Sequence, residues 1–201
     1  MESHTYQVST DRPSNGLYIG NFHKKGITGP DSFAQLTWLP KIGLQLTMWC
    51  YDQYPLAKYI NDNDPISEDC CMACFINVFP SYRYKGYLSI EMNANGVCRC
   101  CFGPNQADRK FITDWGLPQP KVSISHPTRD GGPCWMAKTI ISKELIETLY
   151  DLPFNLKVGH RMRSNFYTYC ESGNSPYWGS WAPISKPDCH LPEYFGLLEI
   201  V

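Results

Sequence analysis

Short runs rich in aromatic and β-branched residues alternate along the chain with clusters of Gly, Pro, Asn and Asp. Runs of this length at fairly regular intervals are typical of an all-β sandwich, with antiparallel strands joined by turns. The expected strands cover residues 44–51, 71–79, 87–93, 97–102, 121–125, 134–140, 161–170 and 196–201. We therefore expect an all-β fold of the antiparallel β-sandwich type.

The strongest turn signal is the segment Asn93-Ala94-Asn95-Gly96 between two of these strands. An Asn-Gly step tolerates positive φ and closes a tight hairpin. We therefore expect residues 71–79 and 87–102 to form neighbouring antiparallel strands.

A single short helix is predicted after Ser142. Ser142 can cap its first turn, Glu144 favours that turn, and apolar residues recur within 145–149 before Pro153 ends the pattern. No internal repeat, low-complexity tract or long linker interrupts the chain, so we expect one domain over residues 1–201.

The charge balance excludes two classes of partner. Eighteen Lys and Arg against nineteen Asp and Glu give a net charge of -1, so no field attracts nucleic acid. No apolar stretch reaches the length needed to cross a bilayer, so we expect no membrane partner. Residues 1–6 show no export signal, which indicates a cytoplasmic protein if this start is native and an extracellular one if a signal peptide was removed.

Six of the ten cysteines lie within residues 69–103, which suggests a zinc site. Strand geometry argues against it, because Cys70 and Cys74 would share a face yet lie roughly 13 Å apart. A zinc knuckle also needs a tight turn, whereas Met72 and Ala73 separate these cysteines. We expect mostly reduced, separately buried thiols with no shared metal.

Four motifs, the first made of two segments, occur in an order that resembles family 9 carbohydrate-binding modules. DCCMACFI at 69–76 and EMNANG at 91–96 are similar to an Asp-Ser-Cys-Val-Glu-x-Phe strand followed by Glu-x-Asn-x-x-Gly. RSNFY at 163–167 resembles Arg-Ala-Asn-Phe-Tyr, and SWAPI at 180–184 resembles Ser-Trp-x-Pro-Ile. PDCHLPEYFG at 187–196 is similar to the closing Pro-Asp-Phe-His-x-Pro-x-x-Phe-Gly.

The resemblance covers roughly residues 15–201 and implies a sandwich of about ten strands. Two positions depart from the family pattern. The acidic residue that binds sugar in the best-known modules falls at Ala73, and a stacking Trp falls near Ser67. A sugar site in this chain would therefore be rebuilt from other residues.

The strand 161–170 supplies the first candidate site residues. A sugar offers an apolar face for stacking and hydroxyls at its rim for polar side chains. Arg163, Asn165 and Tyr167 alternate and so point to one face, presenting a guanidinium, an amide and a phenol. The resemblance places Arg163 where the family uses an amide on the ligand.

Two polar residues on a second strand complete one side of this site. Glu91 and Asn93 share a face, and the resemblance places them where family 9 modules contact sugar. The alternative is a solvated pair in which Asn93 serves the turn.

The closing region adds three more candidates. His190 lies between two prolines that stiffen its loop, although it could instead hydrogen-bond a neighbouring carbonyl. Trp178 and Trp181 are three residues apart and would face opposite sides of a strand. One of them is expected in the core and the other as the stacking wall of a pocket.

We expect a non-catalytic protein that binds an oligo- or polysaccharide without a cofactor, although calcium could bind the acidic loop 62–69. The first alternative is a small hydrolase-like enzyme that uses an acid pair or Cys189 beside His190. The second is a protein-interaction domain that kept the fold and lost the sugar. The sequence leaves the glycan and the oligomeric state open.

Overall fold

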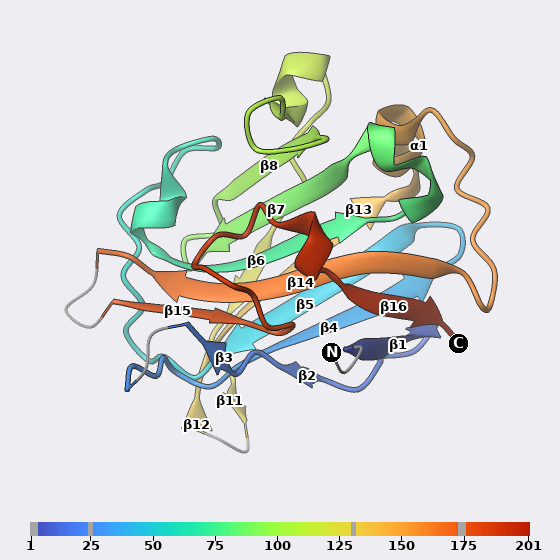
Figure 1. Cartoon of the computed structure of the whole chain (residues 1–201). Coiled ribbons are helices and arrows are strands. Elements are labelled where there is room, and N and C mark those ends of the chain that lie inside the picture. Colours follow the sequence, from blue (N-terminus) through green and yellow to red (C-terminus); the bar gives the residue numbers. More distant parts are fainter. Residues whose placement is uncertain (1–3, 24–25, 130–131, 173–175) are drawn as a thin grey trace.

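The computed structural model describes residues 4–23, 26–129, 132–172 and 176–201. Fourteen strands form one curled sheet that folds over into two layers (Figure 1). The first layer holds β16 (Gly196–Ile200), β14 (Arg161–Cys170), β6 (Cys70–Asn77), β7 (Tyr87–Asn93), β8 (Cys98–Gly103) and β9 (Lys110–Phe111), with β15 (Tyr177–Ser180) and β3 (Asn21–Phe22) beside β14. The second layer holds β4 (Ser32–Leu39), β5 (Gly43–Cys50), β13 (Trp135–Ser142), β10 (Ser123–Ser125) and β2 (Leu17–Tyr18).

Strand β1 (Thr5–Thr10) joins the two layers. Its first half pairs in parallel with β16, and its last two residues pair in parallel with β4. The β-sandwich prediction is confirmed, but the sheet is mixed, because a strand that serves both layers meets two parallel neighbours. A separate hairpin consists of β11 (Thr128–Arg129) and β12 (Gly132–Pro133).

The main core lies between the layers and is built by alternation along each strand. Leu46 and Met48 of β5 face Met72 of β6 and Ile90 of β7 across it, all fully buried. Each such side chain contributes about 1.5–3 kcal/mol through its removal from water.

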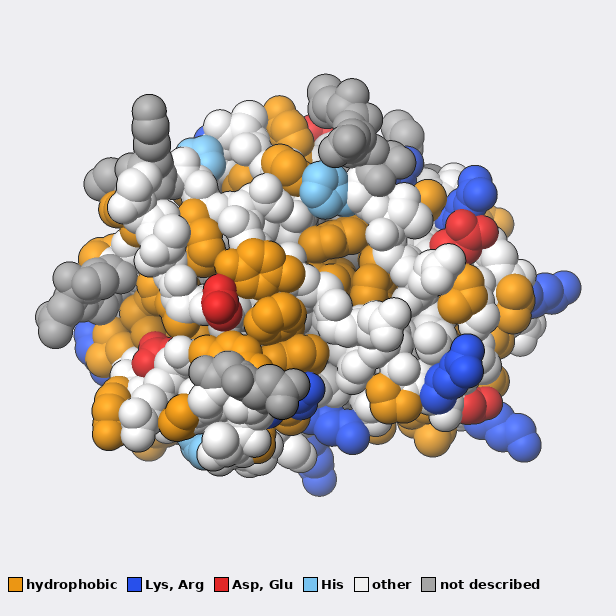
Figure 2. All heavy atoms as spheres, turned by 90° about the horizontal axis from the view of Figure 1, so that it is seen from below, with side chains coloured by type: hydrophobic (Ala, Val, Ile, Leu, Met, Phe, Trp, Pro, Cys, Tyr) orange, Lys and Arg blue, Asp and Glu red, His pale blue; other side chains and the backbone are white. Residues whose placement is uncertain are grey.

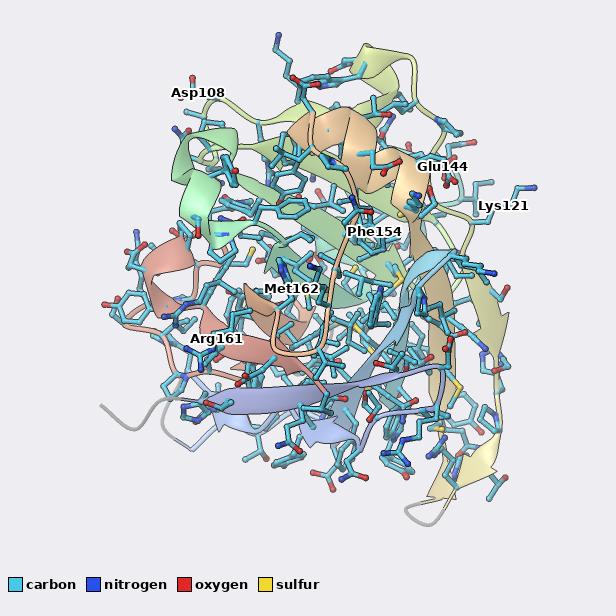
Figure 3. The ribbon with its side chains drawn as sticks, turned by 90° about the vertical axis from the view of Figure 1, so that its right-hand side faces the viewer. Asp108, Lys121, Glu144, Phe154, Arg161 and Met162 are labelled. Atoms are coloured by element: carbon cyan, nitrogen blue, oxygen red, sulfur yellow. A yellow bond between two sulfur atoms is a disulfide. The ribbon has the colours of Figure 1, made fainter. Side chains whose placement is uncertain are left out.

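The end of the sandwich is closed by α1 (Lys143–Tyr150). The Ser142 hydroxyl accepts a hydrogen bond from the Leu145 amide at 3.1 Å, which is the predicted N-cap. Figure 3 looks onto this end, where Phe154 and Met162 point into the space between the layers. The helix prediction is confirmed.

The predicted hairpin joins β7 to β8. Gly96 has φ +83°, and its amide donates to the Asn93 carbonyl at 3.1 Å. β7 pairs with β6 on its other side, as expected.

Four short 3-10 helices lie in the connections. They are η1 (Ile66–Glu68), η2 (Pro80–Lys85), η3 (Ile112–Trp115) and η4 (Pro192–Tyr194). Within the part of the chain that the structure describes, no helix is long and apolar enough to cross a membrane.

The side of the first layer turned away from the main core, here called the outer face, is itself largely covered. Residues 183–195, here called the closing segment, cross in front of β14 and β6 and include η4 (Figure 1). Under them lies a second apolar cluster with Phe75 and Tyr167, to which Phe195 of the segment itself belongs. The outer face is therefore largely buried.

Candidate functional site

Asn93 and Asn165 are fully buried, and their amides hold the fold together. Asn93 accepts from the amides of Asn95 and Val97 and donates to Asp69 Oδ2 at 2.9 Å. Asn93 therefore serves the turn, which is the alternative that the sequence left open.

Asn165 fixes the start of the closing segment. Its Nδ2 donates to the Ala182 carbonyl at 3.0 Å, and its Oδ1 accepts from the amides of Ala182 and Phe166. The expectation that Asn93 and Asn165 line an open pocket is corrected, because their polar atoms bond within the protein.

Trp181 also lies in the main core. It is 8% exposed and meets Tyr6 and Phe166 edge to face, with ring centroids 6.4 and 5.8 Å apart. Of the two tryptophans considered as a stacking wall, Trp181 is thus the core residue, and Trp178 remains partly exposed.

Tyr167 is fully buried on the outer face, under the closing segment. Its hydroxyl donates to the Cys189 carbonyl at 3.2 Å, and its ring packs on Phe75 and Trp178. Burial raises the pKa of Tyr167 well above its usual value. Tyr167 supports Trp178 from below and does not reach solvent itself.

His190, within the closing segment, belongs to a polar cluster with Arg109 and Tyr87. The Arg109 guanidinium donates to its Nε2, and the Tyr87 hydroxyl lies 2.8 Å from its Nδ1. Because a guanidinium can only donate, we assign the ring proton to Nδ1. Burial and the positive charge of Arg109 lower the pKa of His190 to about 4, so the ring is neutral at pH 7.

Arg163 is exposed and lines a different cavity. One of its terminal nitrogens donates to the Phe195 carbonyl at 3.3 Å. The cavity, of about 540 Å³, also has Tyr87, Glu193 and Phe195 in its lining. Arg163 lines this cavity and Trp178 lines another, so these two predicted site residues do not meet in either of them.

Glu91 lies buried beneath Trp178. The Tyr169 hydroxyl donates to Glu91 Oε2 at 2.8 Å, and Trp178 stacks on the Tyr169 ring with centroids 5.9 Å apart and planes 13° from parallel. Burial and the Glu91 charge raise the pKa of Tyr169, so its hydroxyl stays protonated. This Glu91–Tyr169 pair fixes the plane on which the indole rests.

A row across four strands explains the position of Glu91. Tyr167 of β14 lies opposite Ala73 of β6, which lies opposite Glu91 of β7 and then Arg99 of β8. The family pattern has an acidic residue at the position of Ala73, and in this chain an acidic residue, Glu91, lies opposite that position on the neighbouring strand. Its carboxylate bonds to Tyr169, so it acts under the aromatic layer.

Trp178 opens onto a pocket of about 690 Å³, here called the Trp178 pocket. Its lining includes His23, Ile27, Glu171, Tyr177 and Pro187. Burial, followed by the nearby Glu91 and Glu68 carboxylates, raises the pKa of Glu171. The backbone amide of His23 donates to the Trp178 carbonyl at 3.0 Å and holds the facing segment in place. The pocket thus has an aromatic wall with a carboxylate and an imidazole among its lining groups.

Sequence reasoning missed Tyr59, Tyr169, Glu171 and His23. Tyr169 and Glu171 continue the alternation of Arg163, Asn165 and Tyr167 along one side of the chain, a signal that could have found them. Tyr59 packs against the outer-face cluster, as Trp178 does, and donates to Glu68 Oε2 at 2.7 Å. No comparable sequence signal marks His23 or Tyr59, which come from loops.

Cys70 and Cys170 form a disulfide, a pairing the sequence did not predict. They lie directly opposite each other on β6 and β14, so the sheet register brings them together. The other eight cysteines are free, and burial raises the pKa of the thiols of Cys71, Cys74, Cys98 and Cys100.

The acidic loop uses its oxygens internally. Asp69 accepts from the amides of Lys58 and Tyr59, and Asp64 accepts from the Asn61 amide. Among the described residues, no group of three or more His, Cys, Asp or Glu is arranged to hold a metal ion.

The hydrolase alternative finds no support at Cys189. A cysteine nucleophile needs a lowered pKa, but burial and the Glu91 charge raise the pKa of Cys189 well above its usual value. The ring of its neighbour His190 is bonded to Arg109 and Tyr87.

Comparison with solved structures shows similar folds. A candidate carbohydrate-binding protein from Bacteroides uniformis ATCC 8492 matches with a TM-score of 0.80 and 17% identity, over 100% of both chains. A family 9 module from Caldicellulosiruptor kristjanssonii, solved with cellotriose, matches with a TM-score of 0.65 and 12% identity, over 98% of this chain and 93% of that one. The same module solved with glucose also gives a TM-score of 0.65 and 12% identity, over 98% and 96%.

The sequence comparisons assign the family. No curated protein sequence matches this chain. The model of carbohydrate-binding family 9, however, matches residues 43–200, which is most of the chain and includes all four motifs. Its members bind carbohydrate without catalysis, in agreement with the prediction of a non-enzymatic binding protein. The chain therefore belongs to carbohydrate-binding family 9.

Proposed function

We propose that this non-catalytic module binds its saccharide in the Trp178 pocket. The observation that carries the proposal is the indole of Trp178, which is partly exposed and held flat against Tyr169. An aromatic face packs against the C–H face of a pyranose, and carboxylate and imidazole groups bond its hydroxyls. Glu171 and His23 supply those groups, and the volume of about 690 Å³ is typical of ligand clefts.

The ligand class that we infer is a gluco-oligosaccharide. The family 9 module with the same fold is solved with glucose and with cellotriose, which share one ring chemistry. A few hydrogen bonds of about 1 kcal/mol each, with a similar gain from stacking, give a Kd of roughly micromolar or weaker. The donor groups of the site need no cofactor, so calcium should not change this affinity.

Calorimetric titration of wild type with glucose and cellotriose, in chelator and in calcium, tests the proposal. Trp178→Ala should abolish the binding heat, whereas Trp178→Phe should retain part of it. Trp115→Ala is the matched control, because this indole is 48% exposed on η3, outside the lining of the Trp178 pocket. Unchanged binding by Trp178→Ala would contradict the site assignment, and a fall in melting temperature would identify lost folding.

A further inference from the structure

A second cavity, of about 680 Å³, lies at the end of β6 and β14 beside the Cys70–Cys170 disulfide. It is here called the Tyr54 pocket. Its lining includes Tyr51, Asp52, Gln53, Tyr54 and Ser172. The volume nearly equals that of the Trp178 pocket, and the lining has the same combination of aromatic rings and polar groups.

Tyr54 is the most exposed large hydrophobic side chain among the described residues, at 83%. Its backbone amide donates to Asp52 Oδ1 at 3.0 Å, an Asx turn that fixes the backbone under it. Pro55 follows and restricts the backbone further. The fold thus presents an aromatic ring to solvent from a constrained loop.

The loop that carries Tyr54 is anchored to the sheet. The Leu56 amide donates to Cys70 Sγ at 3.3 Å, and the Cys70 amide donates back to the Leu56 carbonyl at 2.8 Å. On the other side, the Tyr51 amide donates to the Asp31 carbonyl at 2.9 Å and its ring meets Phe33 edge to face. Tyr51 and Tyr54 therefore both have fixed backbones.

The two pockets adjoin each other. Ile27 lines the Trp178 pocket and its neighbour Thr28 lines the Tyr54 pocket. Likewise, Glu171 lines the Trp178 pocket and its neighbour Ser172 lines the Tyr54 pocket. Tyr177 lines both pockets. The linings of the two cavities are thus neighbours in sequence at two places and share Tyr177.

One face of the molecule carries few basic side chains on one of its sides. Figure 2 shows the molecule from below in Figure 1, the side on which β2, β3 and β15 lie. Hydrophobic side chains gather over the left half of this face, and most Lys and Arg side chains lie toward its right and lower edges. A neutral saccharide chain fits such a surface better than a polyanion does.

We infer that the Tyr54 pocket is a second saccharide subsite, which takes further sugar units of a chain whose first unit stacks on Trp178. Tyr54 supplies the stacking face, and Asp52, Gln53 and Ser172 supply hydrogen-bonding groups for the hydroxyls. This inference rests on the proposed function. It deepens that function, because it makes a longer oligosaccharide the preferred ligand over a single sugar.

A length series of gluco-oligosaccharides, from glucose to cellohexaose, tests the inference by calorimetry. Wild type should bind the longer members more tightly than glucose. Tyr54→Ala should weaken cellohexaose binding by about three- to tenfold, the worth of one stacking contact, and leave glucose binding unchanged. Tyr54→Phe should keep the affinity, and Trp115→Ala should change neither ligand.

The outcomes separate the two proposals. If Tyr54→Ala binds cellohexaose as wild type does, or loses glucose and cellohexaose equally, the second subsite is refuted while the Trp178 site stands. If wild type binds no member of the series, the proposed function fails and the inference fails with it. Because the Tyr54 side chain is so exposed, the melting temperature of Tyr54→Ala should stay at the wild-type value.

Discussion

The side chains on the two sides of β14 are held by different interactions. On the side facing the main core, Met162 and Phe166 pack among apolar side chains. On the outer face, Asn165 and Tyr167 are buried just as fully, but they bond backbone groups, of Ala182 just before the closing segment and of Cys189 within it. A polar row on a strand therefore does not identify a ligand site, because a covering segment uses the same groups.

Among the changes that test this difference, removal of the Asn165 side-chain amide should lower the free energy of unfolding most. Asn165→Ala leaves the Ala182 amide and carbonyl and the Phe166 amide without this partner, and each unpaired buried group costs about 1–3 kcal/mol. We expect the free energy of unfolding to fall by about 4 kcal/mol, comparable to the 3–5 kcal/mol typical of a buried Phe→Ala change such as Phe166→Ala. Urea denaturation measures both.

Gln106→Ala is the control for Asn165→Ala, because Gln106 is an exposed amide. A loss below about 1 kcal/mol for Asn165→Ala would mean that the outer face is held by packing, like the inner one.

Loss of the disulfide should have the second-largest effect on stability. Reduction of Cys70–Cys170 frees a loop with a sequence separation of 100 residues, which typically costs about 2–4 kcal/mol. Denaturation of wild type with and without reductant measures this loss, and the variant Cys70→Ala/Cys170→Ala should not respond to reductant. Titration of ten free thiols in unreduced, denatured protein would show that the bond is absent.

The pH dependence should be no larger than the disulfide effect, because a single side chain carries it. Burial lowers the pKa of His190 to about 4, so between about pH 6.5 and 4 the unfolded chain binds a proton that the folded chain does not. The contribution of His190 to stability should therefore fall as the pH falls through this window. The stability difference between wild type and His190→Gln, measured by denaturation at each pH, reports it. An unchanged difference from pH 7 to 4 would contradict the burial of a neutral ring.

Local sequence patterns were sufficient for much of the fold. The Asn95-Gly96 step and the Ser142 cap depend on neighbouring residues, so both elements were predicted correctly. β1 and β4 were missed. β1 has a mixed pattern of exposed and buried residues, and its pairing with β16 is set by distant contacts.

The site was harder to predict, because the covering of a strand depends on a segment elsewhere in the chain. Arg163, Asn165 and Tyr167 share a face as expected, but the closing segment buries two of them and leaves Arg163 in another cavity. The disulfide followed from a strand register that no local pattern contains. Which of Trp178 and Trp181 is the core residue depended likewise on which side of the chain faces the core, and the sequence does not show this.

The two-layer role of β1 has a consequence for the order of folding. Thr5–Val8 pair with Leu197–Ile200, and the next residues of the same strand pair with β4. Contacts between such distant segments carry a high loop-closure entropy and form slowly. During synthesis, the first strand leaves the ribosome long before its partner, so the seam between the layers stays open until β16 emerges. We therefore expect closure of this seam to be a late step, and the unpaired edges of β4 and β1 to be the places where nascent chains associate wrongly.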